Sequence, residues 1–592
     1  MSEDTKHSSQ PPGEVPLAAT ETEPPPLPPT HYSEGAISAP RVFWPATVLL
    51  VVFVGFALIA PGTLDEALGT VMDTVVGDLG WFFVLSVTAM VFFSFWIGFS
   101  QMGNIVLGDP DEDPEFSLPS WFAMLFAAGM GIGLVFWGVA EPLNHFASPP
   151  PGTGDSAAAR AREAMDTTFL HWGLHAWAIY VVVGLAMAYA VHRKKRPISI
   201  RWALEPIFGD RVKGWVGDVI DVLAIVGTLF GVATSLGLGV SQVGAGLGHL
   251  GVAEVNDEGS VSTTLLVLLI VGITAIATIS VVTGVDKGIQ FLSNINMVVA
   301  GLLMVTVLLL GPTFFLLSDF VQQLGSYIQN FFRLSFRTFA FSGEDGQGWL
   351  SRWTTFYWGW WISWSPFVGV FIARISRGRT VREFVFGVLL APTLVGLLWF
   401  SIFGGSGIYR EIFGDGGLID SEGAVSTDLA LFQMLDGLPL STLLSVVAIG
   451  LVIVFFVTSS DSGSFVVDMI ASGGDPNPPT WSRILWAVLE GSIAAALIIV
   501  GGAGGSGLSA LQTMSILVAV PFVFVMIGMA VATGKALMRE NELLVHGRRR
   551  QFRKSLVQEV RSEVHDFEEE VNELRSEVRD VLHRDRERRR DR

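Results

Sequence analysis

Long apolar runs recur along most of the chain and are separated by short polar segments. A helix needs roughly twenty apolar residues to cross the hydrocarbon core of a bilayer, and about twelve runs approach that length. They are centred near residues 52, 90, 133, 180, 232, 273, 305, 361, 394, 450, 491 and 523. The pattern predicts an all-α integral membrane protein with about twelve transmembrane helices.

Composition supports this class. Of the 592 residues, 50% are hydrophobic and only 16% are charged. The chain has 0 cysteines, which excludes a disulfide framework, a thiolate metal site and a cysteine nucleophile. We find neither an HExxH pair nor the G-x-S-x-G motif of a serine nucleophile elbow, so an enzyme is not expected.

Polar segments divide the chain into three parts. Residues 1–41 are acidic and rich in proline, which predicts a disordered tail without a cleaved signal peptide. Residues 42–540 hold the predicted spans. In residues 541–592, apolar residues at alternating spacings of three and four predict a helix with an a/d heptad seam. The seam is Val557, Val560, Val564, Phe567, Val571, Leu574, Val578 and Val581.

Basic loops indicate the orientation of the spans. An even number of spans puts both termini on one side, and the basic loops at 192–201 and 374–382 fall on that side. We therefore expect both termini in the cytoplasm and the spans in the cell (inner) membrane. The acidic loop Asp109–Glu115 is assigned to the same side and is the exception to the rule, whereas the acidic loop Glu411–Asp428 lies opposite.

Two predicted spans depart from a regular apolar helix. The third contains Gly129, Gly131 and Gly133, which weaken a helix at its middle, and the eighth is rich in tryptophan. About five spans separate them, as expected for two five-helix units in inverted topology with a substrate site between their first helices. Close helix packing is the alternative explanation for the glycines.

The eighth span carries an aromatic stripe of Trp353, Tyr357, Trp360, Trp361 and Trp364 on one helix face. Such rings suit a weakly hydrated cation such as a quaternary ammonium group, although an interfacial belt with ordinary packing is the alternative. The fourth span offers a second set in Trp172, Trp177 and Tyr180. Its two histidines, at positions 171 and 175, are either proton relays or structural.

Hydroxyl residues gather in the tenth span, where Phe455, Thr458, Ser459 and Ser462 share one face. Their oxygens, beside carbonyls freed by an interrupted neighbouring helix, suit a hard cation such as Na⁺. The alternative is that the hydroxyls bond back to their own helix.

These motifs together resemble the betaine/choline/carnitine transporter family, and most closely its sodium-coupled glycine betaine members. The residues that carry the resemblance are GMGIGLVFWGVAEP, HWGLHAWAIY, FGVATSLGLG, YWGWWISWSPFVGVFIARISRGR and FFVTSSDS, within about residues 42–540. The resemblance implies a LeuT-type fold of inverted five-helix repeats preceded by two extra helices. It also implies a homotrimer that imports a compatible solute under osmotic stress.

The resemblance assigns roles to individual residues. It implies an aromatic box of Trp172, Trp177, Tyr180 and Trp361, with Ile132, Gly133, Ser235, Trp360, Ile362, Ser363 and Trp364 also near the substrate. It implies a sodium site formed by the Ala127, Met130 and Phe455 carbonyls and by the Thr458 and Ser459 hydroxyls. A second sodium site matches at Thr228 and Phe367, but Val232 stands where another hydroxyl is needed.

Charge considerations narrow the expected substrate. A zwitterion such as betaine needs aromatic faces and a helix-end dipole but no buried counter-ion. Gly133 adds no charge to the site. Choline transporters of the resembling family tend to carry an acid at the position that matches Gly133. We expect Na⁺ as the coupling ion and no other cofactor. Alternatives are proton coupling or exchange, with ectoine or another quaternary ammonium compound as substrate. We expect no nucleic-acid partner, and Arg584–Arg592 suits anionic lipid.

Overall fold

The computed structural model describes residues 37–129, 131–256, 260–283, 286–503 and 508–590. Within these ranges the chain is helical, with isolated backbone bridges instead of a sheet. The predicted acidic tail lies outside the described residues up to residue 36. The helices are α1 (Pro40–Ile59), α2 (Pro61–Phe99), α3 (Leu118–Gly129), α4 (Ile132–Ala147), α5 (Ala157–Trp172), α6 (Leu174–Ala188), α7 (Glu205–Phe208), α8 (Trp215–His249), α9 (Thr263–Thr283), α10 (Asp286–Leu310), α11 (Thr313–Ser335), α12 (Gly343–Leu350), α13 (Phe356–Ile375), α14 (Val381–Phe413), α15 (Ala430–Asp436), α16 (Ser441–Ala471), α17 (Thr480–Ala503) and α18 (Ser509–Arg590).

In the described ranges, 10 helical segments are long and apolar enough to cross a membrane. They match the predicted spans except those near residues 133 and 361. Near residue 133 the span is divided into α3 and α4, and near residue 361 it consists of α12, a π-helical turn at Ser351–Thr355 and α13. The prediction of an all-α membrane protein with about twelve spans is therefore confirmed, and both spans singled out from the sequence are irregular.

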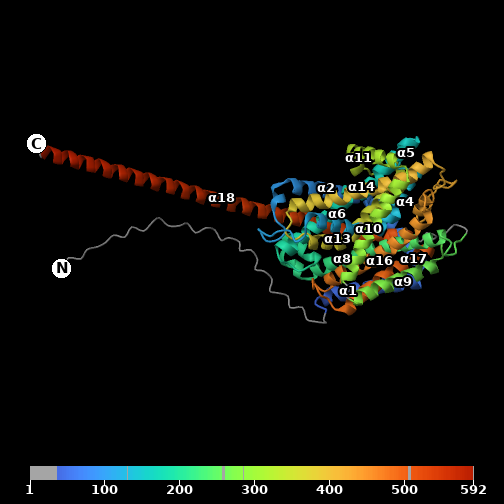
Figure 1. Cartoon of the computed structure of the whole chain (residues 1–592). Coiled ribbons are helices and arrows are strands. Elements are labelled where there is room, and N and C mark those ends of the chain that lie inside the picture. The colour runs from blue at the N-terminus through green and yellow to red at the C-terminus, as the bar shows by residue number, and fades with distance from the viewer. Residues whose placement is uncertain (1–36, 130, 257–259, 284–285, 504–507, 591–592) are drawn as a thin grey trace.

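Helix packing follows the symmetry expected of two inverted units. The first helix of one unit packs against the second helix of the other, α4 on α14 and α13 on α6. The third helices α8 and α16 pack together, as do the fourth helices α9 and α17. The helices α1 and α2 precede both units, and α13 lies inside the bundle between α6, α8 and α18 (Figure 1).

One end of the bundle gathers the basic loops and the acidic loop that broke the charge rule. Glu112 pairs with Arg377 at 2.6 Å, and Lys195 pairs with Asp109 at 3.3 Å. A hydrogen bond to the backbone of Asp109 and the Arg377 charge lower the pKa of Glu112 below its usual value. The acidic loop is thus neutralised by the two basic loops, which explains why it lies at the same end as they do.

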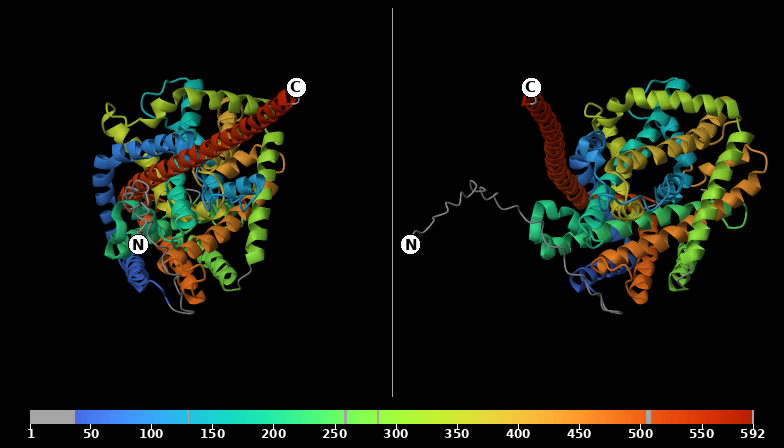
Figure 2. Two further views of the ribbon diagram at one scale, coloured as in Figure 1. Left: turned by 90° about the vertical axis from the view of Figure 1, so that its left-hand side faces the viewer. Right: turned by 60° about the vertical axis from the view of Figure 1, so that its left-hand side comes forward.

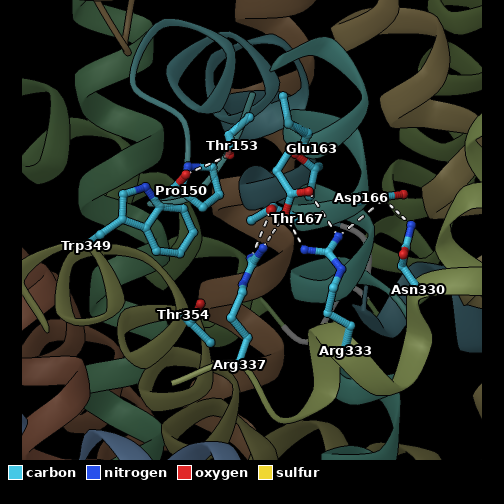
Figure 3. A network of polar contacts seen from close by, with 12 residues as sticks. Pro150, Thr153, Glu163, Asp166, Thr167, Asn330, Arg333, Arg337, Trp349 and Thr354 are labelled. Atoms are coloured by element: carbon cyan, nitrogen blue, oxygen red, sulfur yellow. Dashed lines mark hydrogen bonds and ion pairs between the residues drawn. The ribbon is translucent and has the colours of Figure 1, made fainter. Parts of the chain in front are cut away.

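A second polar network ties α11 to α5 at the opposite end of the span Ala157–Arg193 (Figure 3). Arg337, just after α11, pairs with Glu163 of α5 and donates to the Thr167 hydroxyl at 2.9 Å. Arg333 reaches Glu163 at 3.0 Å. Burial lowers the pKa of Arg337 to about 10, so its guanidinium remains charged at neutral pH.

The last helix is longer than any predicted segment. It begins as the final span and continues without interruption through all 82 residues of α18, so the chain has no helical break at the predicted boundary of residue 541. Its C-terminal part leaves the bundle as an isolated rod (Figures 1 and 2). Seam residues such as Val557, Phe567 and Val581 are more than half exposed, at 53%, 66% and 59%.

Candidate functional site

Most of the tryptophan-rich segment lies in helix α13 at the centre of the bundle. Of the predicted stripe, Tyr357, Trp360, Trp361 and Trp364 lie in α13, and all four are buried. Trp353 belongs to the preceding π-helical turn and packs against His145, with 4.4 Å between ring centroids. The stripe therefore lies deep within the protein and not at an interfacial belt.

The four residues of the predicted aromatic box form a connected cluster. The rings of Trp172 and Trp361 meet edge to face at 4.9 Å between centroids, and Tyr180 lies 6.3 Å from Trp361. Trp177 meets Tyr180 at 5.4 Å. These separations are typical of favourable aromatic pairs, and T-shaped pairs leave ring faces available to a cation.

A local break between α5 and α6 makes this cluster possible. Gly173 separates the two helices with φ −93° and ψ −139°, so Trp172 ends one helix while Trp177 and Tyr180 belong to the next. A Cβ at this position would collide with the carbonyl of Phe169 and would lie 2.9 Å from the Tyr327 hydroxyl. Close packing of the backbone therefore requires glycine here.

Trp360 and Gly133 complete one side of the cluster. Trp360 stacks on Trp361 at 4.6 Å and donates its indole N–H to the Ser235 hydroxyl at 3.2 Å. A Cβ built on Gly133 would lie 2.5 Å from Cη2 of Trp360 and 3.1 Å from Cη2 of Trp172. The absent side chain of Gly133 is thus what lets both rings approach the start of α4.

The remaining predicted substrate residues surround this cluster. Ile132 is buried against α8, with its Cγ2 2.9 Å from a Cβ built on Gly239. The Ser363 hydroxyl donates to the Trp360 carbonyl at 2.8 Å and also faces α8. The Trp364 ring packs on Phe367 at 5.7 Å, and Ile362 is fully buried. Their contact with substrate stays a prediction.

A buried carboxylate that the sequence did not single out supports the box. Glu141 accepts a hydrogen bond from the Trp172 indole at 2.5 Å and contacts Nδ1 of His171 at 2.6 Å. His145 approaches the same carboxylate at 3.2 Å, and Trp361 donates to the His171 carbonyl at 2.9 Å. The sequence signal was the glutamate four residues before His145, together with the His171–Trp172 pair, but their convergence depends on tertiary structure.

The Glu141 cluster also has the composition of a metal site. The ligand atoms of Glu141, His145 and His171 lie within 4.8 Å of one another. However, one carboxylate oxygen meets both histidines and the other accepts from the Trp172 indole. Glu141 therefore orients the Trp172 ring, and His171 positions Glu141 and Trp361.

The predicted sodium ligands lie where α16 passes the break between α3 and α4. The Ser459 hydroxyl is 3.8 Å from a Cβ built on Gly131, so it faces the break. The Thr458 hydroxyl bonds back to the Val454 and Phe455 carbonyls at 3.0 and 3.2 Å, as the alternative interpretation expected. A hydroxyl that donates to a carbonyl still has lone pairs for a cation. Ala127 lies in α3, and Met130 lies outside the described residues.

One ligand position of the second predicted sodium site holds an apolar side chain. Thr228 is buried, and its hydroxyl has no hydrogen-bond partner among the described residues. Val232, one turn later on α8, is also buried and points its methyl groups at Gly463 of α16. Phe367 is buried in α13. Val232 therefore replaces a polar ligand with hydrocarbon.

Comparisons with known proteins agree with this architecture. The family model described as "BCCT, betaine/carnitine/choline family transporter" matches residues 41–542. An uncharacterized transporter of Mycobacterium tuberculosis (strain H37Rv) is 51% identical over 500 residues, which cover 84% of this chain and 82% of the relative. The glycine betaine transporter OpuD of Bacillus subtilis (strain 168) is 43% identical over 84% of this chain and 94% of its own length.

A third relative has a broader name. The glycine betaine/proline/choline/ectoine transporter of Vibrio parahaemolyticus is 44% identical over 83% of this chain and 86% of its own length. The family model and the relatives thus cover the whole helical bundle and describe transporters. The chain therefore belongs to the betaine/carnitine/choline transporter family, and it is a multi-pass membrane transporter and not an enzyme.

Proposed function

We propose that this protein is a secondary active transporter that imports glycine betaine or a related zwitterionic compatible solute with sodium. The observation that carries the proposal is the contact of Trp172, Tyr180, Trp360 and Trp361 beside Gly133. Their electron-rich faces suit a trimethylammonium group. Because Trp172 donates its N–H to the Glu141 carboxylate, its ring faces become more negative and bind a cation better.

The carboxylate of a zwitterion needs a different partner. Helix α4 begins at Ile132, so its first-turn N–H groups and the positive end of its dipole lie beside Gly133 and the rings. Betaine placed between the rings and this helix end satisfies both of its charges without a buried basic side chain. Choline would satisfy only its ammonium group, since it has no carboxylate.

Sodium coupling is proposed on the position of Ser459 and Thr458. Both hydroxyls lie on α16, and Ser459 faces the interruption between α3 and α4. Helix ends at such an interruption expose carbonyls that have no intrahelical partner, which is what Na⁺ requires. Sodium bound there would hold the start of α4 in place for the substrate.

The direct test is uptake of labelled betaine into proteoliposomes with and without an inward sodium gradient. We expect uptake that depends on sodium and is lost in Trp361→Ala. Trp361→Phe is the matched control, because it keeps an aromatic face at the same position. Sodium-independent uptake would overturn the sodium assignment, and equal uptake by Trp361→Ala would overturn the aromatic site.

A broader substrate range is the second candidate, because one relative is named a transporter of glycine betaine, proline, choline and ectoine. Competition assays with these compounds distinguish a narrow site from a broad one. A proton-driven or exchange mechanism is the alternative to sodium coupling, and imposed pH gradients test it.

Orientation and assembly belong to the same proposal. The neutralised loop cluster around Glu112 and Arg377 supports cytoplasmic termini in the inner membrane, because basic loops favour that side. We propose a homotrimer. The exposed seam of α18 supports self-association of this helix, with or without a role in osmotic sensing, and its arginine-rich end suits anionic lipid.

A further inference from the structure

An unpaired carboxylate lies in the middle of a transmembrane helix, away from the aromatic cluster. Glu490 belongs to α17, at the centre of the candidate span Thr480–Gly502. Its side chain is fully buried, and neither carboxylate oxygen has a hydrogen-bond partner among the described residues. Isolated carboxylates are costly inside a membrane, so an acid in this position calls for a compensating cation or a functional role.

The surroundings of Glu490 combine hydrocarbon with one free hydroxyl. A Cβ built on Gly463 of α16 would lie 3.6 Å from Oε2 of Glu490 and 3.3 Å from a methyl group of Val232 on α8. The carboxylate therefore faces the junction of α8, α16 and α17. The Ser460 hydroxyl, three residues before Gly463 on α16, is also buried and makes no hydrogen bond in the described part of the chain.

The helices packed against α17 offer little to neutralise Glu490. Asp461 of α16 carries the same charge as an ionised Glu490 and would repel it. Asp468 of α16 is occupied by Ser482 at 3.0 Å and Trp486 at 3.2 Å, and Arg483 of α17 lies over the Phe465 ring at 4.7 Å. Other ionisable groups of these helices lie within about two turns of the end of a span or beyond it: Arg41 on α1, Asp65, Glu66 and Asp78 on α2, Asp218, Asp221 and His249 on α8, and Lys535 and later residues on α18. Helix α9 has none.

We propose that Glu490 is a proton-binding site that loads and releases one H⁺ as the transport cycle opens and closes the junction of α8, α16 and α17. A proton satisfies a lone carboxylate with a single bond, whereas a metal cation needs a shell of several oxygens. Release of the proton leaves a carboxylate that requires water, so the deprotonated state favours a conformation in which this junction is open.

This inference rests on the proposed transport function and adds a second coupling ion to it. Because α8 and α16 also carry the predicted sodium ligands, a shift of α17 against them links proton release to the same helices. The position of Val232, which supplies hydrocarbon where a second sodium site needs oxygen, is then compatible with a proton in place of a second sodium ion.

The test uses proteoliposomes loaded with a pH-sensitive dye and with equal sodium on both sides. Addition of external betaine is expected to acidify the lumen for the native protein and not for Glu490→Gln, which mimics a permanently protonated side chain. Asp468→Asn is the matched control, because it removes a neighbouring buried acid that has partners, and it should acidify the lumen as the native protein does. Betaine uptake without acidification by the native protein would overturn the proposal, as would acidification by Glu490→Gln.

Two further readouts separate the possible failures. A tenfold or larger rise in the half-maximal sodium concentration in Glu490→Gln, without any proton movement, would mean that the carboxylate binds sodium and would contradict the proposal. Infrared difference spectra of the purified protein at neutral pH do not depend on transport. A protonated-carboxyl band that is lost in Glu490→Gln is expected, and its absence from the native spectrum would overturn the proposal even if betaine is not the substrate.

Discussion

The two spans singled out from the sequence contribute different kinds of groups to the candidate site. The first of these spans is divided into α3 and α4, so this region supplies a helix N-terminus and the space beside Gly133. Helix α13 is continuous across Phe356–Ile375 and supplies side chains, with large rings held by indole hydrogen bonds to Ser235 and to the His171 carbonyl. Under the proposed function, α4 binds the substrate carboxylate through its helix dipole and α13 binds the ammonium group through its ring faces.

The largest effect should come from the rings. Trp361→Ala removes the ring that contacts Trp172, Trp360 and Tyr180. We therefore expect betaine uptake to fall at least about a hundredfold, which is equivalent to roughly 3 kcal/mol. This magnitude is consistent with the loss of a desolvated cation–π contact and of a well-packed ring. Uptake is normalised to the folded protein recovered by size-exclusion chromatography. Trp361→Phe should keep a substantial part of the activity, and a fully active alanine variant would show that α13 does not hold the ammonium group.

The break between α3 and α4 is tested through the predicted sodium ligands that lie beside it. Replacing both Thr458 and Ser459 with alanine should raise the half-maximal sodium concentration for uptake about tenfold, because the loss of one good ligand costs on the order of 1 kcal/mol or more. Thr458→Ser keeps the hydroxyl and should stay near the native value. An unchanged sodium dependence in the double variant would place the sodium site elsewhere.

A third substitution places a negative charge at Gly133, between the start of α4 and the rings of α13. Gly133→Asp should add choline uptake of about the native betaine level or somewhat less, because the new carboxylate pairs with the cation that choline leaves uncompensated. The Trp360 ring must shift, since a Cβ would lie 2.5 Å from its Cη2. Gly133→Ala is the control that causes the same shift without charge. Choline uptake by the native protein would remove the basis for this prediction.

The smallest effect on binding is expected far from both regions. Truncation after Lys554 removes the exposed seam of α18, so the KM for betaine should stay within about twofold of the native value while the oligomeric state or the osmotic activation changes. Light scattering and uptake at raised osmolality measure these two properties. If neither property changes, the seam has no role in assembly or sensing.

The sequence allowed much of this organisation to be predicted because it depends on local patterns. Apolar length predicted the spans, and glycine and tryptophan content predicted two of the irregular ones, whereas the break at Gly173 was not predicted. Placement of the box residues relied on the family resemblance, and the structure brings those residues together. Their binding of substrate stays a prediction.

What the sequence did not reveal depends on contacts between distant segments. Glu141 lies 31 residues before Trp172, and nothing local shows that the two side chains meet. Glu490 stands in an apolar run, where its lack of partners becomes visible only once α8 and α16 are in place. The uninterrupted course of α18 was missed for a different reason: the change from apolar to charged residues suggested a boundary, although most residues there, such as Leu537, Arg539 and Glu540, favour a helix.

We propose that the aromatic cluster binds a zwitterion in a sodium-linked manner, and calorimetric titration of the purified protein with betaine measures this linkage without transport. Thermodynamic linkage requires that sodium tighten betaine binding by the same factor by which betaine tightens sodium binding. We predict that saturating sodium lowers the Kd for betaine about tenfold, that Thr458→Ala combined with Ser459→Ala removes this effect, and that choline binds at least about tenfold more weakly than betaine. Betaine binding that is independent of sodium, or choline binding as tight as that of betaine, would show that the cluster is not a sodium-linked zwitterion site.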